Sequence, residues 1–140
     1  MGIVEPIKID PVEIAISFIR CINLADVPGL CDLMTEDHVF QDALGKRFVS
    51  RETMRQGWTQ YFSMIRNYKV YAQDYFVRDL NVAIFGTASG SYHAGGGAGI
   101  DGFWEVPAAW SVTVRGKLVA EWRVYADNQP LRKLMGERIP

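Results

Sequence analysis

The sequence predicts an α+β fold in which three helices precede most of a curved antiparallel sheet. Up to about residue 65, apolar residues recur mainly at helical spacing. From Tyr68 onward the chain is rich in β-branched and aromatic residues separated by turn signals, which is typical of strands. Helices followed by a run of strands define the α+β class.

Capping residues set the predicted starts of the helices. Asp10-Pro11-Val12-Glu13 offers a cap, a first-turn proline and a carboxylate three residues later, so we expect a helix of about fifteen residues there. Asp26 begins a second, short helix, and Ser50 caps a third over residues 51–65. Between them, Val39 to Asp42 is predicted to be a strand.

Four strands and a short helix are predicted for the rest of the chain. The strands cover residues 68–77, 81–93, 104–114 and 118–126, and the helix lies near residues 131–135. The stretch "HAGGGAGIDG", residues 93–102, is rich in glycine, but strands flank it where a phosphate-binding loop would lead into a helix. We interpret it as a hairpin loop able to close over a cavity.

Side-chain alternation predicts which face of the last two strands is buried. Even positions carry apolar residues, whereas odd positions include Glu121 and Arg123. A two-residue turn at Arg115-Gly116 would send those charges inward at a cost of several kcal/mol. We therefore expect a three-residue loop, residues 114–116, that pairs Thr113 with Lys117.

Composition limits the classes of function. The chain has 140 residues and a net charge of −1, which suits one domain spanning 1–140 and gives no basic surface for nucleic acid. No apolar run reaches membrane-spanning length and no signal segment opens the chain, so a soluble, cytoplasmic protein is expected. Cys21 and Cys31 are interpreted as buried thiols, and neither a metal nor a cofactor is expected.

The order of elements resembles the nuclear transport factor 2-like superfamily, which includes ketosteroid isomerases, SnoaL-like polyketide cyclases and limonene epoxide hydrolases. Two stretches carry the resemblance: "FIRCINLADVPGLCDLMTEDHVFQDALG", residues 18–45, and "EWRVYAD", residues 121–127. It implies a cystatin-like, cone-shaped sheet packed on the three N-terminal helices around an apolar pocket. It also implies a homodimer formed through the outer sheet face.

The resemblance places Asp42 where ketosteroid isomerases keep their catalytic base. Phe18 and Ala108, however, stand where those enzymes carry the tyrosine and aspartic acid that bind the enolate oxygen, so steroid isomerisation by that mechanism is not expected. The epoxide hydrolase mechanism is also disfavoured, because Val124 replaces an aspartate on the last strand. Asp127 is interpreted as a cap of the final helix.

The candidate catalytic residues are Asp42, with a pKa raised by apolar surroundings, and His38 or His93 as helpers. For Asp42 the alternative is a structural role, accepting backbone hydrogen bonds in the turn before Gly45. Tyr61, Tyr71 and Tyr75 are further candidate hydroxyl donors. The predicted ligand-binding residues are mostly aromatic: Phe18, Phe40, Trp58, Phe62, Trp104, Ala108, Trp110, Trp122 and Val124.

Two classes of function follow from this set. The first is a SnoaL-like enzyme of isomerase or cyclase type, in which Asp42 moves a proton on a small apolar, carbonyl-bearing or polycyclic molecule. The second is a non-catalytic ligand-binding or dimerisation module of the same fold. A dehydratase that combines histidine with aspartate is a further alternative.

Overall fold

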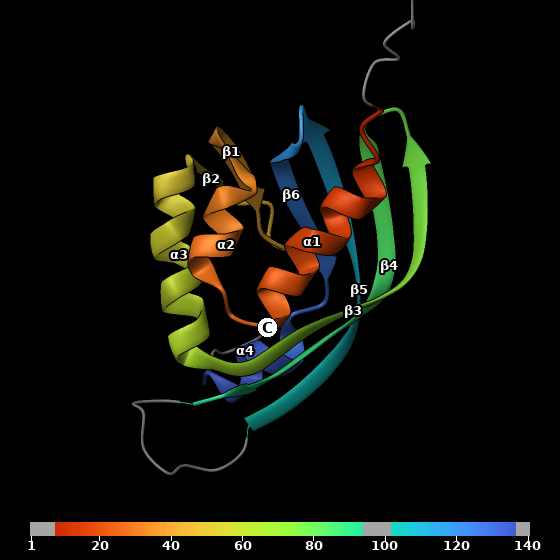
Figure 1. Cartoon of the computed structure of the whole chain (residues 1–140). Coiled ribbons are helices and arrows are strands. Elements are labelled where there is room, and N and C mark those ends of the chain that lie inside the picture. The colour runs from red at the N-terminus through yellow and green to blue at the C-terminus, as the bar shows by residue number, and fades with distance from the viewer. Residues whose placement is uncertain (1–7, 94–101, 137–140) are drawn as a thin grey trace, which may run out of the picture.

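The structure is a computed structural model that describes residues 8–93 and 102–136. Helices α1 (Pro11–Asn23) and α2 (Val27–Asp32) lead into strands β1 (Met34–Gln41) and β2 (Arg47–Val49), followed by helix α3 (Arg51–Met64). The remaining elements are β3 (Ile65–Arg78), β4 (Asn81–Tyr92), β5 (Gly102–Arg115), β6 (Leu118–Ala126) and α4 (Gln129–Leu134). The predicted α+β class is confirmed (Figure 1).

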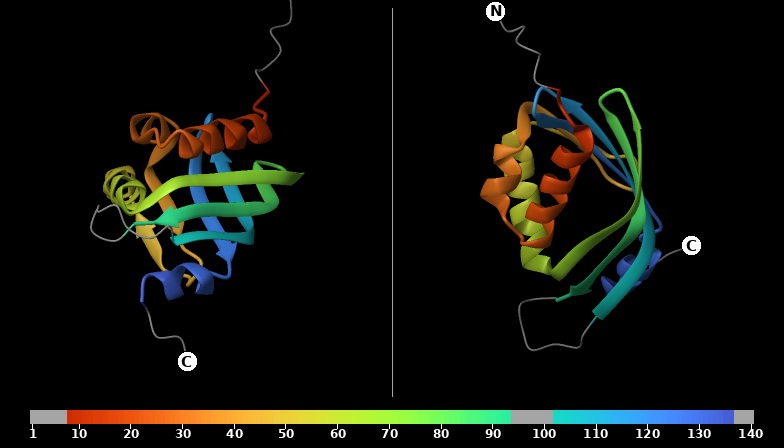
Figure 2. Two further views of the ribbon diagram at one scale, coloured as in Figure 1. Left: turned by 90° about the horizontal axis from the view of Figure 1, so that it is seen from below. Right: turned by 45° about the vertical axis from the view of Figure 1, so that its right-hand side comes forward.

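A single curved sheet of six strands forms one layer, in the order β2-β1-β6-β5-β4-β3. All neighbours are antiparallel except β1 and β6, which are parallel. Helices α1, α2 and α3 lie on the concave side of the sheet, as two further views show (Figure 2). None of the helices in the described part of the chain is long and apolar enough to cross a bilayer.

Side-chain caps start the first three helices, as predicted. Asp10 accepts a hydrogen bond from Val12 N at 3.0 Å, Asp26 accepts one from Gly29 N at 3.0 Å, and the Ser50 hydroxyl accepts one from Thr53 N at 3.1 Å. Each bond satisfies an amide that has no partner within its own helix. Asp127 plays a similar part before α4, where its carboxylate accepts from Gln129 N at 2.9 Å.

Strand β1 is longer than predicted, and β2 was not predicted. The predicted strand began at Val39, whereas β1 starts at Met34. The prediction missed its first half because Glu36 and Asp37 are two consecutive exposed polar residues, which interrupt the alternation of apolar and polar residues. Strand β2 has only three residues and pairs Phe48 with Phe40, too short a segment to show alternation.

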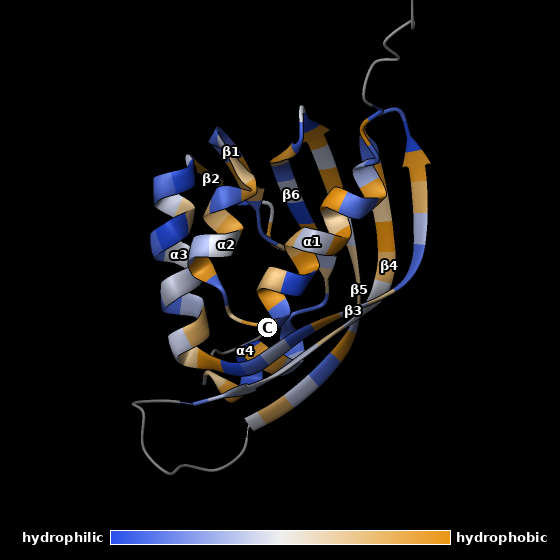
Figure 3. Ribbon diagram, viewed as in Figure 1, coloured by the Kyte–Doolittle hydropathy of each residue, from blue (hydrophilic) through white to orange (hydrophobic). Residues whose placement is uncertain are grey.

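Even-numbered side chains of β5 face inward, which confirms the predicted alternation. All even positions from Gly102 to Val114 are buried, and Figure 3 shows the alternating hydropathy along the strands. In β6 the inward set is Val119 and then Trp122, so the predicted alternation is wrong at Leu118 and Ala120. The physical reason is the geometry of the β5–β6 connection.

The predicted three-residue loop is wrong. The chain turns through Gly116 and Lys117, and Arg115 lies opposite Leu118. A β-bulge then leaves Ala120 without a partner, since Val114 pairs with Val119 and Thr113 with Glu121. Without the extra residue, the tight turn would place Glu121 and Arg123 on the inner face; the bulge returns the even-numbered residues after Ala120 to that face. Glu121 and Arg123 accordingly stay on the outer face, as expected, and pair with each other at 2.7 Å.

A second bulge bends the sheet. The pairing of β3 with β4 shifts between Ala72 and Asp74, directly opposite Gly86. A Cβ atom on Gly86 would lie 1.8 Å from the carbonyl oxygen of Tyr71, so only glycine permits this close approach of the two strands. Bulges increase local twist, and the long strands β3, β4 and β5 curl around the helices (Figure 2).

Candidate functional site

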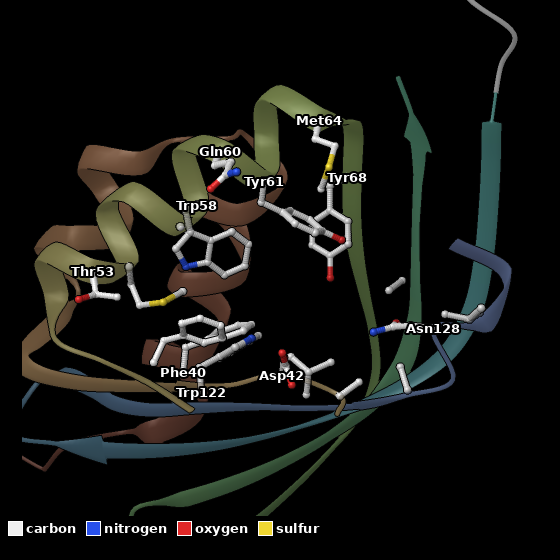
Figure 4. Close-up of a pocket in the computed structure, with 18 of the residues that line it drawn as sticks. Phe40, Asp42, Thr53, Trp58, Gln60, Tyr61, Met64, Tyr68, Trp122 and Asn128 are labelled. Carbon is white, nitrogen blue, oxygen red and sulfur yellow. The ribbon is translucent and has the colours of Figure 1, made fainter. Parts of the chain in front are cut away.

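A cavity of about 390 Å³ lies between helix α3 and the inner face of the sheet. Its lining is mostly apolar and aromatic, with a few polar side chains, which is the usual make-up of a small-molecule site. The lining residues are Phe40, Asp42, Ala43, Phe48, Thr53, Met54, Gly57, Trp58, Gln60, Tyr61, Met64, Tyr68, Ala88, Trp104, Val106, Trp122, Val124, Ala126 and Asn128 (Figure 4).

Aromatic rings from α3 and from the sheet form the walls. Trp58 projects from α3 and meets Phe40 of β1 edge-on at 5.8 Å between ring centroids, and it stacks on Phe62 at 5.3 Å. Trp104 and Trp122 reach the same cavity from β5 and β6. Phe40 lies opposite Trp122 in the sheet, so inward positions on neighbouring strands supply both rings.

Asp42 follows β1 directly and lines the cavity (Figure 4). Its Oδ1 accepts hydrogen bonds from Leu44 N and Lys46 N, both at 2.9 Å, while its own backbone N donates to the Lys46 carbonyl. The carboxylate is therefore fixed by the turn between β1 and β2. Its other oxygen, Oδ2, makes no hydrogen bond within the described residues.

Tyr61 of α3 and Tyr68 of β3 bring two hydroxyl groups to the cavity. Their rings meet edge-on at 5.1 Å. Burial raises the pKa of each phenol well above its usual value of 10, and the neighbouring Tyr68 raises that of Tyr61 further. Both side chains therefore stay protonated, as O–H donors, at pH values where an ordinary tyrosine begins to ionise.

Amide side chains add polar groups near the ends of the cavity. Asn128, at the start of α4, lines it but makes no capping hydrogen bond through its side chain. Gln60 lines it from α3, where its side chain is also exposed to solvent. Neither amide bonds another described side chain, so both are available to a ligand.

The structure brings seven of the candidate site residues to the cavity: Asp42, Phe40, Trp58, Tyr61, Trp104, Trp122 and Val124. Phe18, Ala108 and Trp110 lie instead in the core, exposed by 0%, 8% and 1%. Phe18 packs on Trp122 at 4.8 Å and Trp110 lies 6.4 Å from it, so they support a cavity wall from behind. Phe62 stacks on Trp58 outside the lining.

Neither candidate histidine lines the cavity. His38 is fully buried, and its Nδ1 donates to the Val119 carbonyl at 2.8 Å while its ring stacks on Phe18. Burial lowers the pKa of His38 below its usual value of 6.5. His93 directly follows β4, and its backbone N–H donates to the Met64 carbonyl. The glycine-rich loop that follows, residues 94–101, lies outside the described residues.

Sequence reasoning missed Tyr68, Phe48, Met54, Met64 and Asn128. Alternation gave no guide for Tyr68, because the pairing of β3 with β4 shifts between Arg66 and Lys69. Met54 lies four residues before Trp58 on the buried side of α3, and this helical spacing could have included it. Of the other candidate tyrosines, Tyr71 is 63% exposed and Tyr75 lies outside the lining.

The model of the SnoaL-like domain matches residues 15–128, and the chain therefore belongs to the SnoaL-like family. This family includes cyclases and isomerases. No curated protein matches the sequence.

Solved structures show the same fold at low sequence identity. A proposed SnoaL-like polyketide cyclase from Shewanella denitrificans OS-217 is 14% identical, with a TM-score of 0.79 and coverage of 91% of this chain and 98% of the other. IdmH, a proposed polyketide cyclase from Streptomyces antibioticus, is 18% identical, with a TM-score of 0.74 and coverage of 91% and 99%. A protein from Catenulispora acidiphila with a ketosteroid isomerase-like fold, in complex with trimethylamine, is 20% identical, with a TM-score of 0.72 and coverage of 90% and 94%.

Proposed function

We propose that the protein is an enzyme of isomerase or cyclase type that transfers a proton on an apolar, carbonyl-bearing ligand, with Asp42 as the base. Asp42 Oδ2 removes a proton from the carbon next to the carbonyl. The C–H electron pair forms a C=C bond, and the carbonyl π electrons move to oxygen to give an enolate. When the enolate is conjugated with a C=C bond, Asp42 returns the proton to the far carbon of that bond and the carbonyl re-forms, which gives an isomer. Alternatively, the enolate carbon attacks a second carbonyl carbon of the same molecule, whose π electrons move to its oxygen, and Asp42 returns the proton to that oxygen, which closes a ring.

The position of Asp42 is the observation that supports this proposal. It is the one carboxylate among the described residues that line the cavity, and the walls around it are aromatic and aliphatic. Two backbone amides hold Oδ1, so Oδ2 is presented in a fixed orientation. A positioned base contributes about a hundred- to ten-thousandfold to such a step.

A flat polycyclic ketone suits the shape of the site. The cavity volume of about 390 Å³ falls within the range of small-molecule sites, and Trp58, Trp104 and Trp122 offer ring faces for stacking. The names of two structures of similar fold, both proposed polyketide cyclases, support the same ligand class.

Hydrogen–deuterium exchange tests the proposal without knowledge of the natural substrate. The protein is incubated in D₂O with 2-tetralone, and deuterium uptake next to the carbonyl is followed by mass spectrometry. We expect exchange above the buffer rate, and we expect Asp42→Asn to lower it by about a hundredfold or more.

Asp26→Asn is the matched control. Asp26 also accepts a backbone amide hydrogen bond, from Gly29, but it lies at α2 and outside the cavity lining. Its substitution should leave the exchange rate unchanged. If 2-tetralone binds but Asp42→Asn exchanges deuterium as fast as the wild type, Asp42 is not the base. Binding without any exchange would support the non-catalytic ligand-binding module.

We also propose that the protein forms a homodimer through the outer face of its sheet. Phe76, Phe85 and Tyr125 are 60%, 50% and 49% exposed on that face, and the rings of Phe76 and Phe85 are in contact at 5.8 Å. Ala109 lies between Phe85 and Tyr125 in the strand pairing, so these side chains form one apolar patch. Asp74 and Arg123, of opposite charge, flank it, which suits a two-fold contact of the patch with itself.

Light scattering after size exclusion measures the oligomeric state. The wild type should elute at twice the chain mass, and Phe85→Asp should convert it to a monomer. Leu24→Asp replaces a similarly exposed apolar residue at the end of α1, away from the patch, and should leave the dimer intact. A monomeric wild type would exclude the dimer.

A further inference from the structure

We propose that the hydroxyl groups of Tyr61 and Tyr68 bind the ligand's carbonyl oxygen and stabilise the negative charge that develops on it. The inference rests on the proposed function. It supplies hydrogen-bond donors for the enolate oxygen, which Phe18 and Ala108 cannot provide because neither has a donor in its side chain. It also places the carbonyl end of the ligand beside α3 and β3.

Both hydroxyl groups lack a hydrogen-bond partner among the residues that the structure describes. Tyr61 and Tyr68 make no hydrogen bond within the described residues, although both side chains line the cavity. Tyrosine hydroxyls in largely apolar surroundings usually have a hydrogen-bond partner, and here both open into the cavity. Two such groups side by side in an apolar cavity indicate a place for a hydrogen-bond acceptor from a ligand.

Neighbouring rings hold the two tyrosines in place. Tyr61 meets Trp58 edge-on at 6.1 Å, and Tyr68 packs on Trp104 at 6.0 Å. With the contact between the two tyrosines, this makes a continuous chain of four rings across α3, β3 and β5. Donors fixed before the reaction need little reorganisation when charge develops, which is the condition for effective stabilisation of an oxyanion.

The tyrosines and Asp42 approach the cavity from different sides. Tyr61 and Tyr68 come from α3 and β3, while Asp42 comes from the end of β1 (Figure 4). In this view the Tyr68 hydroxyl points toward the side on which Asp42 lies, and the Tyr61 hydroxyl is seen against the Tyr68 ring. A ligand between them can offer its oxygen to the tyrosines and the neighbouring C–H bond to the carboxylate.

The raised pKa values suit this role. Because burial keeps both phenols protonated, they donate hydrogen bonds and do not act as bases. Asn128 and Gln60 also line the cavity, but Gln60 is open to water, which weakens a hydrogen bond relative to one in an apolar surrounding.

The test compares the binding of 2-naphthol with that of naphthalene, followed by ligand fluorescence. The naphthol oxygen stands in for the enolate oxygen, and naphthalene has the same ring system without it. The wild type should bind 2-naphthol more tightly than naphthalene. Tyr61→Phe and Tyr68→Phe should each weaken 2-naphthol binding by up to about tenfold, the upper end of the effect of one neutral hydrogen bond, and leave naphthalene binding unchanged.

Tyr71→Phe is the matched control, since Tyr71 is exposed on the outside of the sheet. Equal binding of the two probes to the wild type, no binding of 2-naphthol, or 2-naphthol affinity that survives both tyrosine substitutions would overturn the proposal. Asp42→Asn separates this proposal from the proposed function. If that variant keeps the preference for 2-naphthol while wild-type exchange is absent, the base role fails and the donor site stands.

Discussion

Phe40 of β1 lies directly opposite Trp122 of β6 in the one parallel pair of the described sheet. Both side chains point to the concave side and line the cavity. Asp42 follows two residues after Phe40, where the strand has ended and the chain turns into β2. The parallel pairing therefore positions the end of β1, and with it the carboxylate, beside the aromatic walls.

The turn at Asp42 should depend on an acceptor and not on a charge. Asp42→Asn keeps an oxygen that can accept from Leu44 N and Lys46 N, so its free energy of unfolding should stay close to that of the wild type. Asp42→Ala removes both bonds and should cost about 1 kcal/mol. Urea unfolding measures both; equal destabilisation of the two variants would show that the charge holds the turn.

Acid should destabilise the protein through His38. Its pKa is lowered in the folded state by burial, so the unfolded state binds the proton more readily. The stabilising effect of the neutral histidine is complete above about pH 6.5 and is lost as the pH falls through the lower pKa of the folded state. Melting temperatures of wild type and His38→Gln, measured from pH 8 to pH 5, should therefore converge toward low pH.

His93→Gln is the control for this experiment, because it leaves the bond between His38 and Val119 in place. The loss of stability in acid that His38 causes should persist in this variant. A constant difference between wild type and His38→Gln at all pH values would contradict a lowered pKa.

Alkaline pH should also destabilise the protein, in this case through Tyr61 and Tyr68. Their pKa values are raised in the folded state, so the unfolded chain loses these protons first and stability falls as the pH rises above about 10. Tyrosinate absorbance should show two phenols that ionise only with unfolding. Tyr61→Phe and Tyr68→Phe should each remove one of these two phenols from the titration. If all tyrosines ionise while the protein is still folded, the raised pKa values of Tyr61 and Tyr68 are contradicted.

Two glycines should respond oppositely to alanine. Gly57 lies within α3, and a Cβ there would meet the Met54 side chain at an ordinary distance of 3.5 Å. Gly57→Ala should therefore raise the free energy of unfolding by about 0.5 to 1 kcal/mol. Gly86→Ala would press a methyl group onto the Tyr71 carbonyl and should cost about 3 kcal/mol or more. Urea unfolding measures both variants. If Gly86→Ala leaves the free energy of unfolding unchanged, β3 can move away from β4 without cost.

The sequence by itself determined the features that depend on near neighbours. The caps at Asp10, Asp26 and Ser50 act within one helical turn, and the alternation of β5 follows from strand geometry alone. The family resemblance predicted the curved sheet and indicated Asp42 as a site residue, and Asp42 does line the cavity.

Only the tertiary structure decided which inward residues face the cavity and which fill the core. Trp104, Trp110 and Trp122 have the same predicted facing and all three are buried, yet Trp104 and Trp122 line the cavity and Trp110 does not. Helix α1 contacts the sheet and fills one part of the concave side with Phe18, while α3 leaves a space beside the other part. That difference depends on distances between helices and strands far apart in the chain, which spacing along a sequence does not contain. The bulge at Ala120 and the meeting of Tyr61 with Tyr68 were decided in the same way, by contacts between separate elements.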